Sequence, residues 1–328
     1  MIWFVEEGIG EHRAVQISAG RIVRAKVQWA NDIAPGAIVE AVLIARSSGS
    51  DRATARMANG AELLVSGLPR TASEGSRTVL EITRGAIVEA GRIKRAQART
   101  SQACLDPMPS LVHRLRKAGE EVQLVEQFPD EASCGAGWNN LLGEALCGLV
   151  DFDGGTLQLS STPAMTLIDV DGGLPPDALA LAAVPRIASA IGRLDLAGSI
   201  GIDFPTLQSR SARQAVDRAL DAALAGWAHE RTAMNGFGFV QIVARNEGPS
   251  ILQRCAVMPR TAAVHLLLRQ AQRVREPGAI LLVMHPTLIP LLKPEHLAEL
   301  ARRTGRIIRT SVNESLALDG GFAQAVTI

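Results

Sequence analysis

Apolar and polar residues alternate in short runs through the first third of the chain. The runs at 2–5 and 14–17, and a longer one that begins at Arg21, predict β-strands near the N-terminus. From 36 to 84 further strand-like runs follow, separated by turns rich in Gly, Ser and Asn. Short strands at this spacing are typical of a small closed barrel of the OB type. We therefore predict that an OB-like β-barrel is inserted near the N-terminus.

The apolar residues change to a helical period after residue 138. The sequence DFDGGTLQL at 151–159 predicts a tight hairpin at its Gly-Gly pair, and the stretch at 176–196 predicts a helix that is broken near Pro185. A buried strand at 199–204 and a long amphipathic helix after it complete a predicted α/β layer. Helices and strands alternate again toward the C-terminus, which predicts a second, small α/β unit.

The predicted class is α/β in the broad sense, with mixed α+β character. We expect an N-terminal β segment that packs on the core, a degenerate OB-like barrel, a connecting segment, a central α/β layer and a small C-terminal α/β domain. Their expected bounds are 1–35, 36–103, 104–148, 149–248 and 249–328.

Composition sets broad limits on the class of protein. Hydrophobic residues make up 47% of the 328 residues, enough for the cores of more than one globular unit. No apolar run reaches the roughly 20 residues that span a bilayer, so we expect no membrane insertion. The four cysteines form no C-x-x-C pair, which argues against a disulfide framework and a thiolate zinc site. We expect a cytoplasmic protein.

Overall charge does not favour a nucleic-acid partner, because 34 Lys and Arg residues nearly cancel 33 Asp and Glu residues. Any affinity for a polyanion must come from local patches of cations. The stretch 85–117 is such a patch, with basic groups in GRIKRAQART and HRLRK. These groups are either two solvated helix faces or contacts for phosphates, and the sequence leaves both readings open.

Two aspartates stand where apolar strands end, Asp169 in LIDVDGG and Asp203 in SIGIDF. If the two strands are neighbours, the carboxylates meet at one sheet edge and repel each other, and a hard divalent ion with oxygen ligands removes that repulsion. Such an ion favours hydrolysis of phosphodiesters. The alternative is that each Asp only caps the turn after its strand, which is common for Asp near Gly.

These segments resemble a known family. The sequences DFDGGTLQLSSTPAMTLIDVDGG and GRLDLAGSIGIDF are similar to the part of ribonuclease E/G proteins that carries two metal-binding aspartates, and the resemblance extends more weakly over most of the chain. It implies that Asp169 and Asp203 are catalytic ligands of Mg²⁺, which Mn²⁺ can replace. Asp171 stands where the family usually has an Asn that orients the site. The resemblance makes 149–248 the nuclease domain and 104–148 a shortened remnant of the family's 5′ sensor.

The chain departs from the family at several points. Its stretch ILQRCAVMPRT has Cys255 alone where the family's zinc link has a C-P-x-C motif, so we expect no zinc, and a homodimer formed without zinc remains open. The sensor remnant lacks the family's Arg-Thr pair, and Gly236 and Ala244 stand at expected Arg positions. The predicted barrel has no aromatic platform for stacking bases.

Contact with RNA would therefore be electrostatic, and the resemblance and the basic patches suggest these side chains for it: Arg84, Arg92, Lys94, Arg95, Arg114 and Arg245. The predicted function is that of a magnesium-dependent endoribonuclease, in which metal-activated water attacks the phosphodiester of single-stranded RNA. The rival hypothesis is a catalytically weak or inactive RNA-binding or regulatory protein with the same fold.

Overall fold

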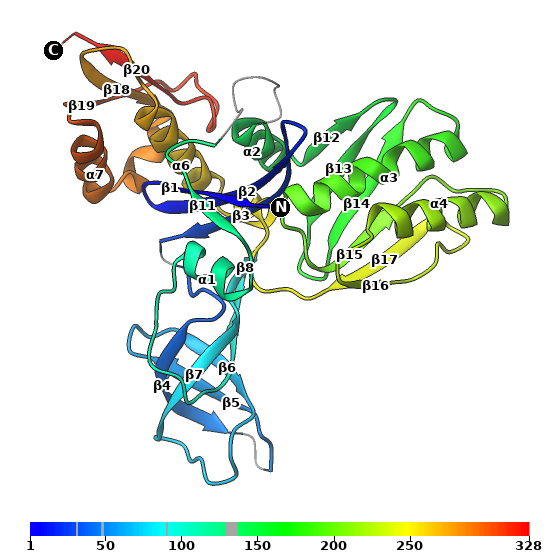
Figure 1. The fold of residues 1–328 in the computed structure, drawn as a ribbon, viewed down its shortest axis with the longest axis horizontal. Helices are drawn as coiled ribbons and strands as arrows, with labels where there is room; N and C mark the ends of the chain where they lie inside the picture. Colours follow the sequence, from blue (N-terminus) through cyan, green and yellow to red (C-terminus); the bar gives the residue numbers. More distant parts are fainter. Residues whose placement is uncertain (31, 47–48, 90, 129–136, 328) are drawn as a thin grey trace.

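A computed structural model describes the chain except residues 31, 47–48, 90, 129–136 and 328 (Figure 1). The fold is a mixture of helices and strands. Near the N-terminus, a four-stranded sheet has the order β11-β1-β2-β3. Its strands are β1 (Trp3–Glu7), β2 (Glu11–Ser18), β3 (Arg21–Trp29) and β11 (Val122–Leu124). The last strand returns from the predicted sensor remnant and pairs in parallel with β1. Residues 129–136 of that predicted remnant lie outside the described residues.

The predicted barrel is confirmed as a closed, five-stranded β-barrel with the order β10-β6-β5-β4-β7. Its strands are β4 (Ile38–Arg46), β5 (Ala53–Met57), β6 (Glu62–Ser66), β7 (Arg77–Arg84) and β10 (Ala96–Thr100). Strands β10 and β6 close it in parallel, and this arrangement is consistent with an OB-like barrel. Leu43, Leu63 and Leu80 are buried inside it. The barrel is separate from the other layers in Figure 1.

The basic stretch after the barrel's fourth strand does not form the helix that one reading of its charges assumed. It forms a short hairpin of β8 (Ile87–Glu89) and β9 (Arg92–Lys94), followed by β10. Only the second basic group is helical, in α1 (Leu111–Lys117). Leu111, Val112 and Leu115 of α1 pack on the N-terminal sheet beside Trp3 and Val5.

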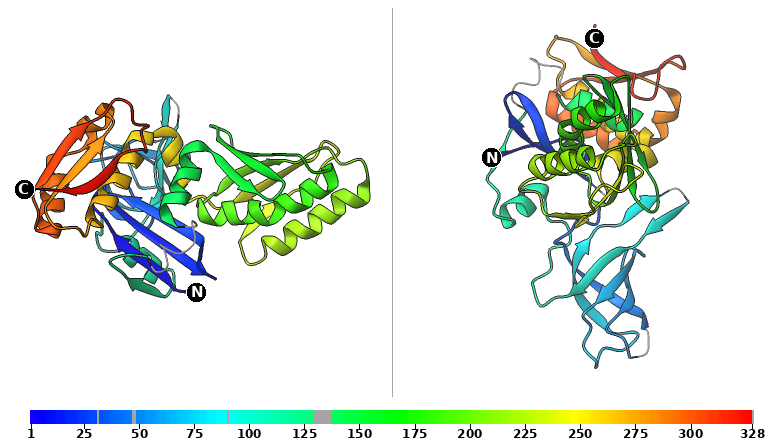
Figure 2. Two further views of the ribbon diagram at one scale, coloured as in Figure 1. Left: turned by 90° about the horizontal axis from the view of Figure 1, so that it is seen from above. Right: turned by 90° about the vertical axis from the view of Figure 1, so that its right-hand side faces the viewer.

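The central part of the chain forms a six-stranded sheet with the order β12-β13-β14-β15-β17-β16. The strands are β12 (Leu149–Phe152), β13 (Gly155–Ser161), β14 (Thr166–Gly172), β15 (Gly198–Asp203), β16 (His229–Arg231) and β17 (Phe239–Ala244). Two long helices, α3 (Pro176–Arg193) and α4 (Arg210–Ala223), lie on the same side of this sheet (Figures 1 and 2). The predicted hairpin between β12 and β13 is confirmed, with Gly154 at a positive φ of 94°.

The expected break near Pro185 is wrong, because α3 runs through that residue without interruption. Proline removes one helical hydrogen bond and crowds the carbonyl four residues earlier, which here belongs to Leu181. Leu181 is exposed, so water can satisfy its carbonyl. The buried stripe of Ala180, Val184 and Ile187 continues across the proline, and its packing on the sheet holds the two halves together.

The C-terminal part forms a smaller three-stranded sheet with the order β19-β18-β20. Its elements are α5 (Ile251–Val257), α6 (Pro259–Gln272), β18 (Ala279–Met284), α7 (Pro294–Thr304), β19 (Ile308–Val312) and β20 (Phe322–Val326). Helix α2 (Trp138–Cys147), from the connecting segment, packs against α5. Within the described residues, no helix is both long and apolar enough to span a bilayer.

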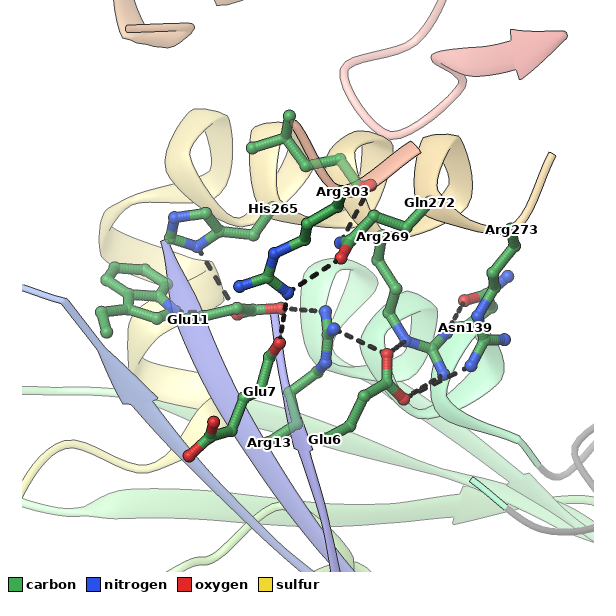
Figure 3. Close-up of polar contacts among 12 residues, drawn as sticks. Glu6, Glu7, Glu11, Arg13, Asn139, His265, Arg269, Gln272, Arg273 and Arg303 are labelled. Atoms are coloured by element: carbon green, nitrogen blue, oxygen red, sulfur yellow. Dashed lines mark hydrogen bonds and ion pairs between the residues drawn. The ribbon is translucent and has the colours of Figure 1, made fainter. Parts of the chain in front are cut away.

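A buried ionic network joins the N-terminal hairpin to the C-terminal part (Figure 3). Arg13 of β2 is 1% exposed and donates to Glu11 and to Glu6, at 2.7 Å in each case. Glu6 also accepts from Arg269 of α6 at 3.2 Å. Burial works to raise the pKa of Glu11, but Arg13 and His265 outweigh it and hold that pKa at about 2. Charges buried at this depth stabilise the fold only while all of them are paired.

Removing one member of this network should therefore destabilise the protein strongly. We expect Glu6→Ala to lower the free energy of unfolding by about 3–5 kcal/mol, because it leaves buried guanidinium groups with one carboxylate fewer. The matched control is Glu40→Ala, which removes an exposed pair with Arg77 and should cost less than about 1 kcal/mol. Denaturant unfolding followed by circular dichroism measures both, and equal losses would contradict the role given to the network.

Candidate metal and RNA site

The two aspartates singled out in the sequence lie side by side. Strands β14 and β15 are parallel neighbours, and their register pairs Asp169 with Asp203 as the last pair of the ladder. Neighbouring strands are about 4.8 Å apart, so the two carboxylates start from adjacent backbone positions. One detail of the expectation is wrong: Asp169 lies within β14, because this strand continues to Gly172 along its other neighbour, β13.

Both carboxylates face away from the helices. Side chains alternate between the two faces of a strand. Ile168 and Val170 of β14 and Ile202 of β15 are buried in the core that includes α3. Asp169 and Asp203 are exposed, so they lie on the opposite face of the sheet. The sheet thus presents two adjacent negative charges to solvent, on a rigid backbone.

Within the residues that the structure describes, no cation compensates the charges of this pair. Neither Asp169 nor Asp203 forms an ion pair with any residue in the described part of the chain. Partial burial raises the pKa of Asp169, and the negative charges of Asp203 and Asp171 raise it further. A divalent cation would relieve this repulsion, and two carboxylates on a rigid, open surface are the oxygen donors that Mg²⁺ prefers.

The donor set is small. Among the described residues, no three His, Cys, Asp or Glu side chains are grouped closely enough to hold a metal ion. A divalent ion at this site would be held by Asp169 and Asp203 and would keep water as its remaining ligands, as Mg²⁺ commonly does. Asp171 lies on the same face, but one of its carboxylate oxygens accepts a hydrogen bond from the backbone N–H of Gly172 at 2.9 Å. Asp169 likewise accepts a backbone hydrogen bond from the next residue, Val170, so this contact does not distinguish Asp171 from the pair.

A short loop next to the pair was missed by the sequence reasoning. The side chain of Asn235 accepts from the backbone N–H groups of Phe237 and Phe239, at 2.9 and 3.0 Å. Phe239 begins β17 opposite Asp203, and its ring covers Gly201, where a Cβ would lie 2.6 Å from the ring. Phe237 is 82% exposed. In the sequence this loop is marked by Phe237 between two glycines, Gly236 and Gly238. The expectation stated above concerned only Gly236, which stands where the family has an arginine.

The basic candidates on the barrel side are engaged with protein groups. Arg92 and Lys94 both pair with Glu89, at 2.7 and 2.5 Å, and Arg95 pairs with Glu62 at 3.0 Å. Arg84 donates to the backbone carbonyl of Arg95 at 2.8 Å. Arg92 and Lys94 share one carboxylate and Arg95 shares Glu62 with Arg56, so these carboxylates compensate only part of the positive charge. A polyanion would have to compete with these carboxylates for the basic side chains.

Lys94 also links the barrel hairpin to the central sheet. Its Nζ donates to the carbonyl of Pro163 at 2.8 Å, in the loop that leads into β14. The barrel is thereby attached next to the strand that carries Asp169.

Two further candidates, Arg114 and Arg245, lie together on a cavity of about 370 Å³ that Lys26 and Trp227 also line. Burial lowers the pKa of Arg114, which lies among the carboxylates of Glu247, Asp195 and Asp32. Arg245 comes directly after β17. The last residue of that strand, Ala244, pairs with Gly198, which lies five residues before Asp203 along β15. At about 3.3 Å per residue the cavity lies roughly 17 Å from the carboxylate pair. The structure thus separates the basic candidates into two groups.

Cys255 is buried in α5, and burial raises the pKa of its thiol to about 12, with a further increase from Glu11. Zinc binds the thiolate, which this environment disfavours at neutral pH. Cys134 lies outside the described residues.

The chain was compared with models of protein families and with curated proteins, and neither comparison found a match. The function of the site must therefore be argued from its geometry and chemistry. The feature that stands out is the uncompensated pair of carboxylates on the open face of the sheet.

The repulsion within this pair leads to a prediction about stability. At neutral pH Asp169→Asn should leave the melting temperature unchanged or raise it by about 1–2 °C, because the amide carries no charge for Asp203 and Asp171 to repel. The pKa of Asp169 is higher in the folded chain than its ordinary value of 3.8. The protonated carboxyl group therefore stabilises the fold fully below the ordinary pKa, and this stabilisation is lost as the pH rises through the folded pKa. The advantage of the variant should therefore disappear in acid.

Thermal unfolding between neutral pH and about pH 3 measures this difference. In the same experiment Mg²⁺ should stabilise the wild-type chain and leave Asp169→Asn unaffected, since only a folded site with both carboxylates binds the ion. Asp319→Asn, in the C-terminal part, is the matched control and should respond to Mg²⁺ like the wild type. An equal response of Asp169→Asn to Mg²⁺ would show that the ion binds elsewhere.

Proposed function

We propose that the protein is a magnesium-dependent endoribonuclease that cleaves single-stranded RNA, a shortened relative of the ribonuclease E/G family. The observation that carries the proposal is the register of β14 and β15, which places Asp169 beside Asp203, while no cation among the described residues compensates either charge. Fixed, paired carboxylates on an open face suit a divalent ion and a long polyanionic substrate, because the ion removes the repulsion that would otherwise exclude a phosphate.

In the proposed mechanism, Asp169 and Asp203 would hold Mg²⁺, or Mn²⁺ in its place. When bound, such an ion supplies Lewis-acid activation of the phosphodiester and lowers the pKa of attacking water. The carboxylates fix its position because they belong to adjacent strands of one sheet, and a rigid arrangement needs little reorganisation during the reaction. Val170 and Ile202 hold the two strands against the helices from the other face.

The proposal also assigns roles to the parts of the chain. The central sheet with α3 and α4 would be the nuclease layer, at 149–248, and the barrel would guide RNA through the hairpin that touches Pro163. The small C-terminal α/β domain and the N-terminal segment would support this arrangement through the buried network of Glu6, Glu11 and Arg13. We place the protein in the cytoplasm, where its RNA substrates would be.

The competing proposal is an RNA-binding or regulatory protein without efficient catalysis. It is favoured by the small donor set, since no third acidic or imidazole side chain joins the pair among the described residues. The pairing of Arg92, Lys94 and Arg95 with carboxylates further weakens the hold on a substrate. Catalysis distinguishes the two proposals directly.

The first test is cleavage of a labelled, unstructured RNA with Mg²⁺ and with EDTA. We expect cleavage only with Mg²⁺, and we expect Asp169→Asn and Asp203→Asn each to lower kcat/KM by about 10³-fold or more, because each removes a charged ligand worth several kcal/mol in the transition state. Circular dichroism should show that both variants stay folded. Asp171→Asn restores the residue usual in the family and should retain cleavage. Full activity of both ligand variants would refute the metal site.

The second test concerns zinc. We expect elemental analysis of the purified protein to find no stoichiometric Zn²⁺, and Cys255→Ser to leave the oligomeric state unchanged, because the buried thiol disfavours the thiolate that zinc requires. Light scattering before and after chelation provides the second readout. One tightly bound zinc per dimer, lost together with the dimer on chelation, would overturn this expectation.

A further inference from the structure

The loop between β16 and β17 exposes the phenylalanine side chain of Phe237 to solvent. Phe237 is 82% exposed, more than any other large hydrophobic residue of the described chain. Burying a phenylalanine side chain is worth roughly 1.5–3 kcal/mol, so a ring left outside lacks a packing role in the folded chain. Single exposed hydrophobic residues are common on protein surfaces, and exposure alone decides nothing. The hydrogen bonds within this loop and its contacts with the end of β15 distinguish Phe237 from other exposed residues.

The loop is built to hold the ring where it is. The Asn235 side chain accepts from the N–H groups of Phe237 and Phe239, and the backbone N–H of Asn235 donates to the carbonyl of Phe239 at 3.1 Å. Gly238 has a φ of 92°, and a Cβ there would lie 2.4 Å from the carbonyl oxygen of Phe204. Only glycine fits this position. The ring of Phe237 thus projects from a tight, hydrogen-bonded turn.

The same turn is anchored to the strand end that carries Asp203. The backbone N–H of Phe204, the next residue, donates to the carbonyl of Gly238 at 3.1 Å. The hydroxyl of Thr206 lies 3.5 Å from the carbonyl of Phe237. Phe239 is the register partner of Asp203 itself. The exposed ring is therefore fixed two residues from the backbone position that faces the carboxylate pair.

We propose that Phe237 is a stacking residue that binds an unpaired nucleobase next to the phosphodiester held at Asp169 and Asp203, so that it selects single-stranded RNA. The inference rests on the proposed function and adds a specificity residue to it. An aromatic ring offers a flat π face to any base, and base–aromatic stacking is worth about 1–3 kcal/mol per base. The face of a base is available only when the base is unstacked from its neighbours, as in single strands and loops.

This assignment supplies what the barrel lacks. Between Ala30 and Ala103 the sequence contains no Phe, Trp or Tyr, so the barrel cannot stack bases. Its basic residues Arg92, Lys94 and Arg95 attract phosphates of single and double strands alike. A stacking residue beside the carboxylates would therefore be the feature that distinguishes the two forms of RNA. An interface with another protein is the competing use of such a ring, and it is an outcome of the test.

The test measures binding with Ca²⁺ in place of Mg²⁺, because both ions take oxygen ligands and the carboxylates then stay neutralised. It uses a fluorescein-labelled oligouridine and a duplex of equal length, and a gel checks after each titration that the RNA is intact. Phe237→Ala should weaken binding of the single strand by about 5- to 150-fold, the equivalent of 1–3 kcal/mol, and should leave duplex binding unchanged. Phe237→Trp should restore binding, whereas Phe237→Leu should not, because leucine replaces the apolar area without the π face. Phe322→Ala, an exposed phenylalanine of the C-terminal part, is the matched control and should bind like the wild type.

The outcomes separate this inference from the proposed function. If the wild type binds and cleaves RNA and Phe237→Ala does so equally well, stacking is refuted and the endoribonuclease stands. Equal rescue by leucine would also refute stacking, as would a change in oligomeric state of Phe237→Ala in light scattering, which assigns the ring to a protein interface. If the wild type neither binds nor cleaves RNA, both ideas fail together. A selective loss of single-strand binding, rescued by tryptophan, supports the inference even if cleavage is undetectable.

Discussion

The parallel pairing of β14 with β15 is the constraint on which the proposed function of this chain depends. Among the described residues it is the one parallel contact in the central sheet, and it brings Asp169 and Asp203 to the same level although 34 positions separate them in the sequence. A parallel pair needs a crossover, and α3 supplies it. The same helix buries Ile168 and Val170, so the packing that stabilises the sheet also determines that the aspartates face solvent.

Acidic side chains occur in two contrasting environments in this protein. In the N-terminal hairpin, Glu6 and Glu11 are buried and fully engaged with arginines, which is a structural use of charge. At the central sheet, Asp169 and Asp203 lie on the open face and pair with no cation among the described residues. Partial burial raises the pKa of Asp169, and the charges of Asp203 and Asp171 raise it further. Repulsion between fixed carboxylates is a cost that a stable fold does not need, and it is consistent with a site that receives an external cation.

Local patterns in the sequence predicted most elements, and they indicated that the two aspartates meet if their strands are neighbours. The barrel, the Gly-Gly hairpin before Thr156 and the alternation of strands and helices follow from turn residues and apolar periods. Long-range contacts could not be predicted in this way. The pairing of Arg95 with Glu62 joins residues far apart in sequence, and the continuity of α3 through Pro185 depends on packing against the sheet. The role proposed for Phe237 rests on its exposure and on its place next to β15, which the sequence does not show.

The central claim is that Asp169 and Asp203 form a binding site for a divalent cation. Anomalous diffraction from crystals soaked in Mn²⁺ tests it directly, because Mn²⁺ scatters anomalously and prefers the same oxygen donors as Mg²⁺. We expect an anomalous peak between the two carboxylates, with Mn–O distances of about 2.2 Å and water as the remaining ligands. The peak should be missing from crystals of Asp203→Asn. Mn²⁺ bound only at other acidic residues, with this pair left without an ion, would contradict the account.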